Sequence, residues 1–292
     1  MNKKTKKEKL KQFDLRVLEV KNTLPPMTLP REYDERLPAI PGVTLFLGRC
    51  KSGKTNCAIN YLANPEMAGL GRDRPCIFDT IYYCSKTARM DRSTQILFRE
   101  EYDHIIVYED TDNLDAFIGN VIDYQNSFPI DDEDNPRPLI AIVMDDISGQ
   151  LKANKRTVNL FSRYRHANIG QLIVINQDLK SLPTIARSMA ENVFIAKTTS
   201  IKEREKILEE WGDLYENKLL KAWEYCVDEP YSFCYLKMDK LIPEMYKVSS
   251  KGFEKVDWQS FGITLPSQLK NMYKNENGVK NKKSNIIIKS NE

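Results

Sequence analysis

The stretch that decides the fold is Gly48-Arg49-Cys50-Lys51-Ser52-Gly53-Lys54-Thr55. It fits the pattern G-x-x-x-x-G-K-[ST]. A short, apolar, β-prone run, residues 43–47, precedes it, and residues 56–63, which favour a helix and contain no Gly or Pro, follow it. In a strand–loop–helix context the glycines let the backbone wrap closely, so that its N–H groups and the positive end of the helix dipole face a phosphate. The sequence therefore predicts that all eight residues hold the phosphates of a nucleoside triphosphate.

Two side chains at the end of this loop have predicted roles of their own. Lys54 is expected to reach the β- and γ-phosphates, and the Thr55 hydroxyl to ligate Mg²⁺. The alternative, a structural turn with a surface lysine, would not need a strand before the loop and a helix after it.

The bulk composition is that of a globular protein with an ample core. The chain has 292 residues, of which 41% are hydrophobic and 29% charged, and no apolar run approaches the length of a membrane span. The N-terminus has no apolar segment behind its lysines and does not resemble a secretory signal. The six cysteines form no C-x-x-C pair and only two histidines accompany them, which argues against zinc and favours reduced thiols in a cytosol-like compartment.

The net charge of +3 is distributed unevenly along the chain. Residues 1–12 hold six lysines and one glutamate, and residues 270–292 hold six lysines and two glutamates, so the segment between them carries a net negative charge. Nucleic-acid contact is therefore expected from local loops or from the two basic tails, although such tails are most often solvated ends.

The expected organisation has five parts. They are a basic tail (1–21), a proline-rich arm (22–42), a P-loop ATPase domain (43–240), a C-terminal extension (241–269) and a second basic tail (270–292). The arm, with prolines at positions 25, 26, 30, 38 and 41, should form neither helix nor central strand.

Short apolar strands alternate with helical stretches along the domain. After the loop we expect strands at 81–84, 104–108, 139–144, 171–176, 192–197 and 232–238, the last closing the sheet. Helices are expected at 111–125 and 155–164, with one or two more in 201–225. This order predicts an α/β fold, a parallel-sheet P-loop NTPase of the additional-catalytic-carboxylate class, with helices on both faces.

A pair of carboxylates follows the apolar run at 139–144. Ligands bind at the carboxyl ends of the strands in open α/β sheets, which is where Asp145 and Asp146 fall. Asp145 is expected to hold Mg²⁺, directly or through a water, and Asp146 to act as general base for hydrolysis of the γ-phosphate. Adjacent acids also occur as plain helix N-caps.

The strand at 171–176 ends in amides, Asn176 and Gln177. In ATPases of this class the strand after the acidic one lies between it and the loop strand, and its tip senses the γ-phosphate. Gln177 can donate to that phosphate and accept from the attacking water. Asn176 takes this role if the register shifts by one, and a loop-capping amide is the simpler alternative.

Basic side chains between these strands are candidates for an arginine finger, an arginine that reaches the nucleotide of a neighbouring subunit. Arg163 and Arg165, with His166 beside them, are the first candidates and Arg187 is the second. A helix end with solvated arginines is the alternative.

Taken together, these features resemble the genome-packaging ATPases of large DNA viruses and virophages, the poxvirus-type branch of the FtsK–HerA superfamily. The likeness spans about residues 40 to 240 and is carried by Gly48–Thr55, Asp145 and Asp146, Arg165 and His166, Gln177, Leu182-Pro183 before Arg187, and Tyr231-Ser232-Phe233. It implies an ATP- and Mg²⁺-dependent homo-oligomeric ring that moves double-stranded DNA into a capsid. Capsid or portal proteins would be its partners, and the host cytoplasm (viral factory) or the virion its location.

One position departs from the wider superfamily, whose members mostly carry Asp-Glu where this chain has Asp145-Asp146. The shorter side chain must lie closer to the attacking water, because a misplacement of about 1 Å can cost ~10²-fold in rate.

Two other functions remain open from the sequence. A small-molecule kinase also uses this loop on a parallel sheet, but has no need of a sensor such as Gln177. A non-catalytic NTP-binding regulatory module would need neither Gln177 nor Asp146.

Overall fold

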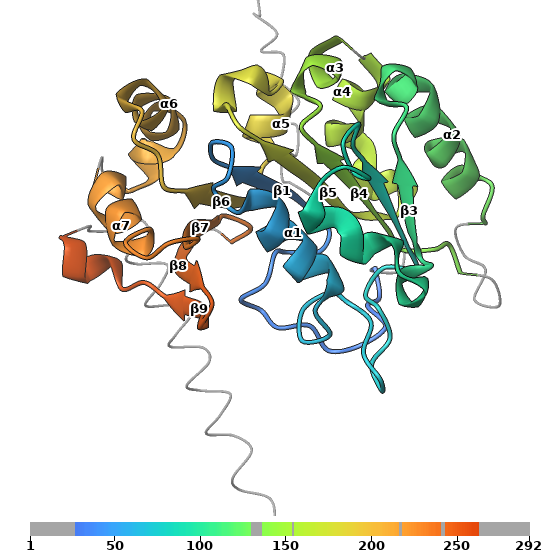
Figure 1. Ribbon diagram of the computed structural model, residues 1–292, viewed down its shortest axis with the longest axis horizontal. Helices are drawn as coiled ribbons and strands as arrows, with labels where there is room; N and C mark the ends of the chain where they lie inside the picture. The colour runs from blue at the N-terminus through green and yellow to red at the C-terminus, as the bar shows by residue number, and fades with distance from the viewer. Residues whose placement is uncertain (1–26, 130–135, 154, 216–217, 241–242, 263–292) are drawn as a thin grey trace, which may run out of the picture.

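The computed structural model describes residues 27–129, 136–153, 155–215, 218–240 and 243–262 (Figure 1). The predicted basic tails, 1–21 and 270–292, lie outside the described residues, as do the first five residues of the predicted arm.

Strands and helices alternate through most of the chain. In order they are β1 (Gly42–Leu47), α1 (Lys54–Ala63), β2 (Thr80–Cys84), β3 (Ile105–Tyr108), α2 (Leu114–Asn126), β4 (Ile140–Asp145), α3 (Ser148–Ala153), α4 (Lys155–Arg163), the 3₁₀ turn η4 (Tyr164–Ala167), β5 (Ile169–Asn176), α5 (Thr184–Ser188), β6 (Asn192–Ala196), α6 (Ile201–Trp211), α7 (Leu219–Cys226), β7 (Phe233–Lys237), β8 (Glu244–Ser249) and β9 (Gly252–Lys255). All the predicted strands and helices are present, with ends that differ by a few residues, and the stretch 201–225 holds two helices.

All nine strands belong to one sheet, in the order β3-β2-β4-β5-β1-β6-β7-β8-β9. The six strands from β3 to β6 run parallel to their neighbours, and β5 lies between β4 and β1, as predicted for the additional-catalytic-carboxylate class. The prediction of a parallel sheet holds for this part only, because β7, β8 and β9 pair antiparallel.

The expectation that residues 232–238 close the sheet was wrong. β8 and β9, within the predicted extension 241–269, continue it by two strands. β8 has four buried residues in a row, a pattern that its mixed sequence, Glu-Met-Tyr-Lys-Val-Ser, does not suggest because Lys247 is among them.

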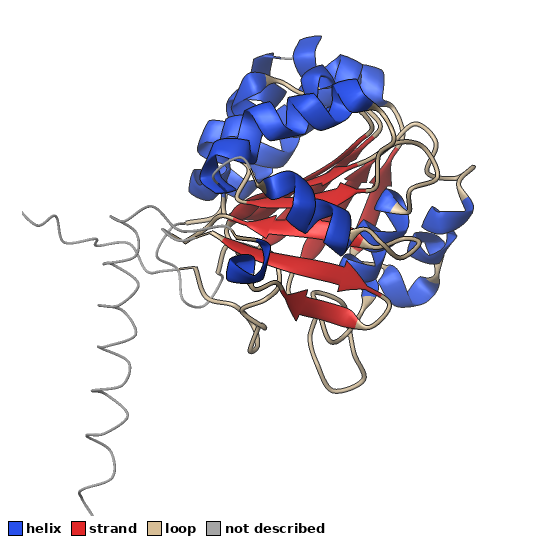
Figure 2. Cartoon of the chain, turned by 90° about the vertical axis from the view of Figure 1, so that its left-hand side faces the viewer, coloured by secondary structure: helices blue, strands red, loops and turns tan. Residues whose placement is uncertain are grey.

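Helices cover both faces of the sheet, as predicted (Figure 2). On one face α2, α4, α5, α6 and α7 pack on side chains such as Leu45, Ile142 and Val174. On the other, α1 and the segment after it pack on alternate side chains of the same strands, including Phe46 and Val143. Strands buried on both faces explain the continuous apolar runs in the sequence.

Residues 27–41 of the predicted proline-rich arm form neither helix nor strand, as predicted, whereas its last residue, Gly42, begins the central strand β1. Polar contacts fasten the arm to the sheet. The buried ammonium of Lys237 on β7 donates to the carbonyl of Leu37 over 2.8 Å, and the backbone N–H of Ala39 donates to Asn192 Oδ1 over 3.1 Å. These contacts position the start of β1.

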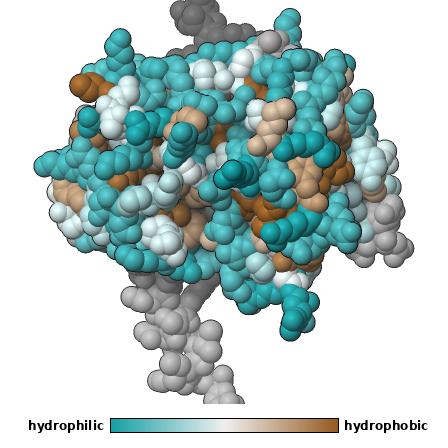
Figure 3. Space-filling model, in the orientation of Figure 1, coloured by the Kyte–Doolittle hydropathy of each residue, from teal (hydrophilic) through white to brown (hydrophobic). Residues whose placement is uncertain are grey.

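The surface is mainly hydrophilic on the face drawn in Figure 3. None of the helices in the described part of the chain combines the length and the apolar character needed to cross a membrane.

Candidate active site

The loop between β1 and α1 is shaped by its two glycines. A Cβ at Gly48 would lie 2.6 Å from the Cβ of Ala196, closer than two carbons can approach. Gly53, the N-cap of α1, has φ of 89°, and Lys51 has φ of 63°. Alternating left- and right-handed residues turn successive N–H groups to one side, which makes an anion-binding concavity at the helix N-terminus. The Ser52 hydroxyl is buried there with no hydrogen-bond partner among the described residues, so the loop has a spare polar group for a phosphate.

Lys54 lies inside this concavity and is only 6% exposed. Its ammonium donates to the carbonyl of Arg49 over 3.1 Å, which folds the side chain back over the loop. Burial lowers the pKa of Lys54, and the carboxylates of Asp146 and Asp145 act in the opposite direction. The side chain is thus a cation held at the loop, near the two acids at the end of β4.

Asp145, the last residue of β4, is buried and faces the start of α1. The same carboxylate oxygen of Asp145 accepts two hydrogen bonds, from the Tyr83 hydroxyl over 2.6 Å and from the Thr55 hydroxyl over 3.4 Å. Burial raises the pKa of Asp145 to about 6, while the hydrogen bond from Tyr83 opposes that rise. A hydroxyl and a carboxylate side by side are the oxygen ligands that Mg²⁺ prefers, and Mg²⁺ commonly takes only one or two protein ligands. Thr55 and Asp145 therefore fit a magnesium ion.

Asp146 turns away from its neighbour and is exposed. Its backbone has φ of 54°, and its N–H donates to the carbonyl of Ile175 over 3.1 Å, so the chain leaves β4 with the side chain on the open side. Gln177 Nε2 lies 3.3 and 3.2 Å from the two carboxylate oxygens of Asp146. The adjacent acids are thus separated, one buried beside Thr55 and the other at the surface beside an amide.

Asn176 does not share this surface. Its side chain is 3% exposed and donates to the carbonyl of Asp178 and to the Ser181 hydroxyl, each over 2.6 Å. Asn176 caps the loop after β5, and Gln177 is the amide that faces Asp146.

The three candidates for an arginine finger lie away from Lys54, Asp145 and Gln177. Arg165 sits in η4, immediately before β5, and so at the amino edge of the sheet, opposite the phosphate loop. It forms an ion pair with Glu191, which directly precedes β6, and donates to the Tyr164 hydroxyl over 3.0 Å. The structure thus holds Arg165 against its own subunit's sheet.

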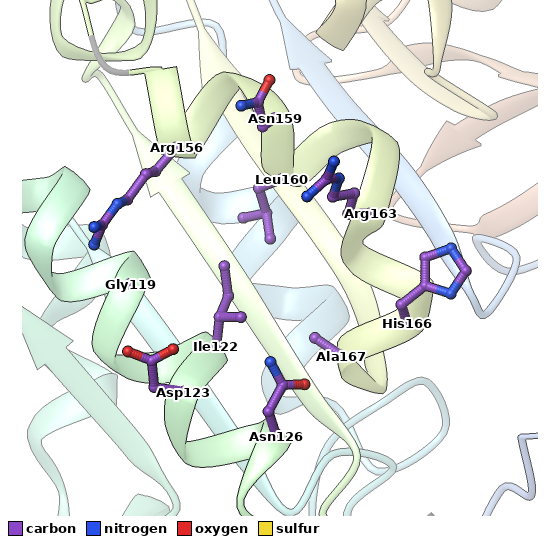
Figure 4. Close-up of a pocket in the computed structure, with 10 residues that line it drawn as sticks. All are labelled: Gly119, Ile122, Asp123, Asn126, Arg156, Asn159, Leu160, Arg163, His166 and Ala167. Atoms are coloured by element: carbon purple, nitrogen blue, oxygen red, sulfur yellow. The ribbon is translucent and has the colours of Figure 1, made fainter.

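Arg163, at the end of α4, has no ion-pair or hydrogen-bond partner among the described residues. It lines a groove of about 350 Å³ between α2 and α4, together with Arg156 and His166 (Figure 4). Asp123 from α2 lines the same groove. The groove is open, mostly basic on its α4 side, and distant in the topology from the phosphate loop.

Arg187, on α5, is bound within the helical layer. Its guanidinium forms an ion pair with Glu210 of α6 and donates to the Thr184 hydroxyl over 3.2 Å. With a side-chain exposure of 12%, Arg187 is half-buried and paired.

No family model and no curated protein matches this chain. Among solved structures it is similar to the genome-packaging NTPase B204 of Sulfolobus turreted icosahedral virus 2 in complex with ATP-gammaS, at 14% identity and a TM-score of 0.47, over 70% of this chain and 95% of that one. It is also similar to the pCW3 conjugation coupling protein TcpA with ATPgS, at 12% identity and a TM-score of 0.48, over 85% of this chain and 75% of that one. A third is the cytoplasmic domain of the Thermomonospora curvata type VII secretion ATPase EccC, at 13% identity and a TM-score of 0.39, over 53% of this chain and 19% of that one.

The sequence did not predict one contact of the site, the hydrogen bond from Tyr83 to Asp145. Tyr83 lies within the predicted strand, but nothing in the run Ile81-Tyr82-Tyr83-Cys84 says which tyrosine faces β4 and the loop. A signal did exist, since a tyrosine in a buried strand needs a partner for its hydroxyl. Finding that partner required the order of the strands.

Proposed function

We propose that this chain is an ATP-hydrolysing motor that moves double-stranded viral DNA into a capsid as an oligomeric ring. The observation that carries the proposal is the convergence of Lys54, Thr55, Asp145, Asp146 and Gln177 at the carboxyl edge of the sheet. These five residues supply a cation, a pair of metal ligands, an exposed carboxylate and an amide, which together are the parts that nucleotide hydrolysis requires.

Each side chain has a chemical task in this proposal. The N–H groups of the loop and the Lys54 ammonium bind the phosphates and stabilise the charge that develops on them. Thr55 and Asp145 would hold Mg²⁺, which would neutralise part of the negative charge on the phosphates. Asp146 accepts a proton from the attacking water, and Gln177, hydrogen-bonded to Asp146, orients that water and contacts the γ-phosphate.

The contact between Gln177 and Asp146 favours hydrolysis over the two alternatives. A kinase must exclude water and admit an acceptor, whereas here the carboxylate and its amide stand exposed. A passive nucleotide-binding module gains nothing from an exposed acid paired to an amide at the place where the γ-phosphate would lie.

The proposals that the chain forms a ring, moves DNA and acts on a capsid are supported by the resemblance of the motifs and by the position of the arginines. Arg163 and Arg165 lie at the amino edge, so an arginine finger from this chain would act on a neighbouring subunit, as a homo-oligomeric ring provides. DNA contact would be to phosphates, through local basic loops or the two lysine-rich tails, and would not read bases. Capsid or portal proteins would be the partners, and the host cytoplasm or the virion the location.

The test is ATP hydrolysis by the full chain with and without duplex DNA, run alongside a measurement of the oligomeric state by analytical ultracentrifugation. We expect turnover that duplex DNA stimulates, with a stimulation that falls steeply as salt rises. Lys54→Ala is the control and should abolish turnover. Transfer of phosphate to a nucleoside, or unchanged turnover in Lys54→Ala, would contradict the proposal.

A further inference from the structure

Tyr231 is an aromatic residue in an unusual setting. Its side chain is 72% exposed, and its backbone has φ of 58°, a left-handed conformation that residues other than Gly, Asn and Asp rarely adopt. A strained backbone persists only where the surrounding structure holds it, and such residues gather at ligand-binding sites. An exposed aromatic ring held in this way calls for a reason outside the packing of the core.

The turn that carries Tyr231 is firmly held. The backbone N–H and the hydroxyl of Ser232 both donate to the carbonyl of Glu229, over 3.4 and 2.6 Å. The buried Lys247 of β8 pairs with Asp228 over 2.6 Å and with Glu229 over 3.5 Å. The ring is therefore presented by a fixed turn, and its position is set by contacts that do not involve the ring.

The ring lies on the phosphate loop. A Cβ added to Gly53 would sit 3.1 Å from Tyr231 Cδ1, so a larger residue at position 53 would push the ring away. Gly53 thus serves two purposes, a left-handed turn at the start of α1 and room for this ring.

The order of the strands decides which part of a bound nucleotide the aromatic ring of Tyr231 would contact. β5 and β4, with Gln177 and Asp145, lie on one side of β1, and β6 and β7 lie on the other. Because β7 is antiparallel, Phe233 at its start pairs with Ala196 at the end of β6, which brings Tyr231 to the edge that holds the phosphate loop. A nucleotide whose γ-phosphate points to Asp146 and Gln177 extends its other end, the base, toward β6 and β7.

We infer that Tyr231 is the platform on which the base of the bound nucleotide stacks. This inference rests on the proposed function, because it assumes that the loop binds a nucleoside triphosphate with its γ-phosphate on the β4–β5 side. Every base has an apolar π-face, and stacking on a tyrosine needs the ring and not the hydroxyl. Since purines offer the larger face, a purine base fits this platform.

The experiment compares a ligand that has a base with one that lacks it. Binding of Mg-ATP and of inorganic Mg-tripolyphosphate is measured by calorimetry on the full chain and on Tyr231→Asn, Tyr231→Phe and Tyr124→Ala. Asn removes the ring yet tolerates the left-handed backbone, Phe keeps the ring, and Tyr124, 52% exposed on α2, is an aromatic control away from the loop.

We expect Tyr231→Asn to weaken ATP binding by about 5- to 100-fold and to leave tripolyphosphate binding unchanged. Tyr231→Phe and Tyr124→Ala should bind both ligands as the wild type does. Equal losses for ATP and tripolyphosphate in Tyr231→Asn would mean that the ring only shapes the loop, and would overturn the inference. Unchanged ATP affinity in Tyr231→Asn would also overturn the inference. In both cases the proposed function stands as long as the wild-type chain binds ATP and tripolyphosphate. Failure of the wild type to bind either ligand would instead refute the proposed function.

Discussion

The two edges of the sheet carry opposite kinds of chemistry. At the carboxyl edge, Lys54, Asp145 and Gln177 meet around the phosphate loop, each within hydrogen-bond reach of another group of the site. At the amino edge, Arg163 and Arg165 stand beside the start of β5. β5 has 8 residues, which at about 3.3 Å per residue separate the two edges by roughly 26 Å.

If the carboxyl edge binds and hydrolyses a nucleotide as proposed, this separation keeps the arginines of η4 and α4 away from the nucleotide of their own chain. An arginine side chain spans only a fraction of that distance. If either arginine takes part in hydrolysis, it does so across an interface. The two arginines differ as well, because Arg165 is paired with Glu191 and Arg163 has no partner among the described residues.

The largest expected effect tests the amino edge. Arg163→Ala should lower turnover by ~10³–10⁵-fold, the loss typical of a missing arginine finger. Mixing Arg163→Ala subunits with Lys54→Ala subunits should restore part of the activity, because an intact loop then meets an intact arginine. ATP hydrolysis across a series of mixing ratios measures this recovery.

Arg156→Ala is the matched control, since Arg156 lines the same groove from the same helix. A loss as large in Arg156→Ala, or no recovery at any mixing ratio, would argue that the groove has a local role and that the two edges do not cooperate. The same mixing with Arg165→Ala shows whether breaking the ion pair with Glu191 has any catalytic consequence.

The next effect tests the carboxyl edge alone. Asp146→Asn keeps the shape of the side chain but removes its capacity to accept a proton, so kcat should fall by ~10²–10⁴-fold. The affinity for ATP should stay near that of the wild type, because Asp146 is exposed and faces Gln177. Asp123→Asn, the same change in the groove at the amino edge, is the control and should leave kcat unaltered.

The smallest expected effect concerns Asp145 and its pH dependence. Its pKa of about 6 means that the carboxylate is charged at neutral pH and becomes protonated as the pH falls through that value. Mg²⁺ must then displace a proton, so its apparent affinity in the presence of ATP should fall by about tenfold per pH unit below the pKa. Magnesium titrations of hydrolysis between pH 5 and pH 8 measure this directly.

Tyr83→Phe sharpens the same measurement. The hydrogen bond from Tyr83 opposes the rise of the Asp145 pKa. Its removal should therefore move the midpoint of the pH dependence to higher pH and weaken Mg²⁺ binding by about 10- to 100-fold. Tyr82→Phe, on the neighbouring residue of β2, controls for the loss of a hydroxyl. An unchanged midpoint in Tyr83→Phe would show that Tyr83 packs in the core without tuning the carboxylate.

Much of the architecture could be predicted because buried parallel strands have a strong local signature. The run 139–144 is apolar because β4 is covered on both faces, and the acids after it mark the end of the strand. β8 and β9 were missed for the opposite reason. They lie at the antiparallel end of the sheet, where charged residues such as Lys247 and Lys255 alternate with apolar ones and a short strand looks like a loop.

The sequence by itself determined the strand, glycine loop and helix around residues 48–55, the place of Asp145 and Asp146 at the end of β4 and the class of fold. A strand, a glycine loop and a helix are contiguous in the chain and need no distant partner. The tertiary structure alone decided that Tyr83 faces Asp145, that Gln177 and not Asn176 meets Asp146, and that Tyr231 lies on Gly53. It also placed Arg163 and Arg165 at the far edge. These facts depend on which strands are neighbours and in which direction each one runs, and both are set by the packing of the whole sheet rather than by any local stretch of residues.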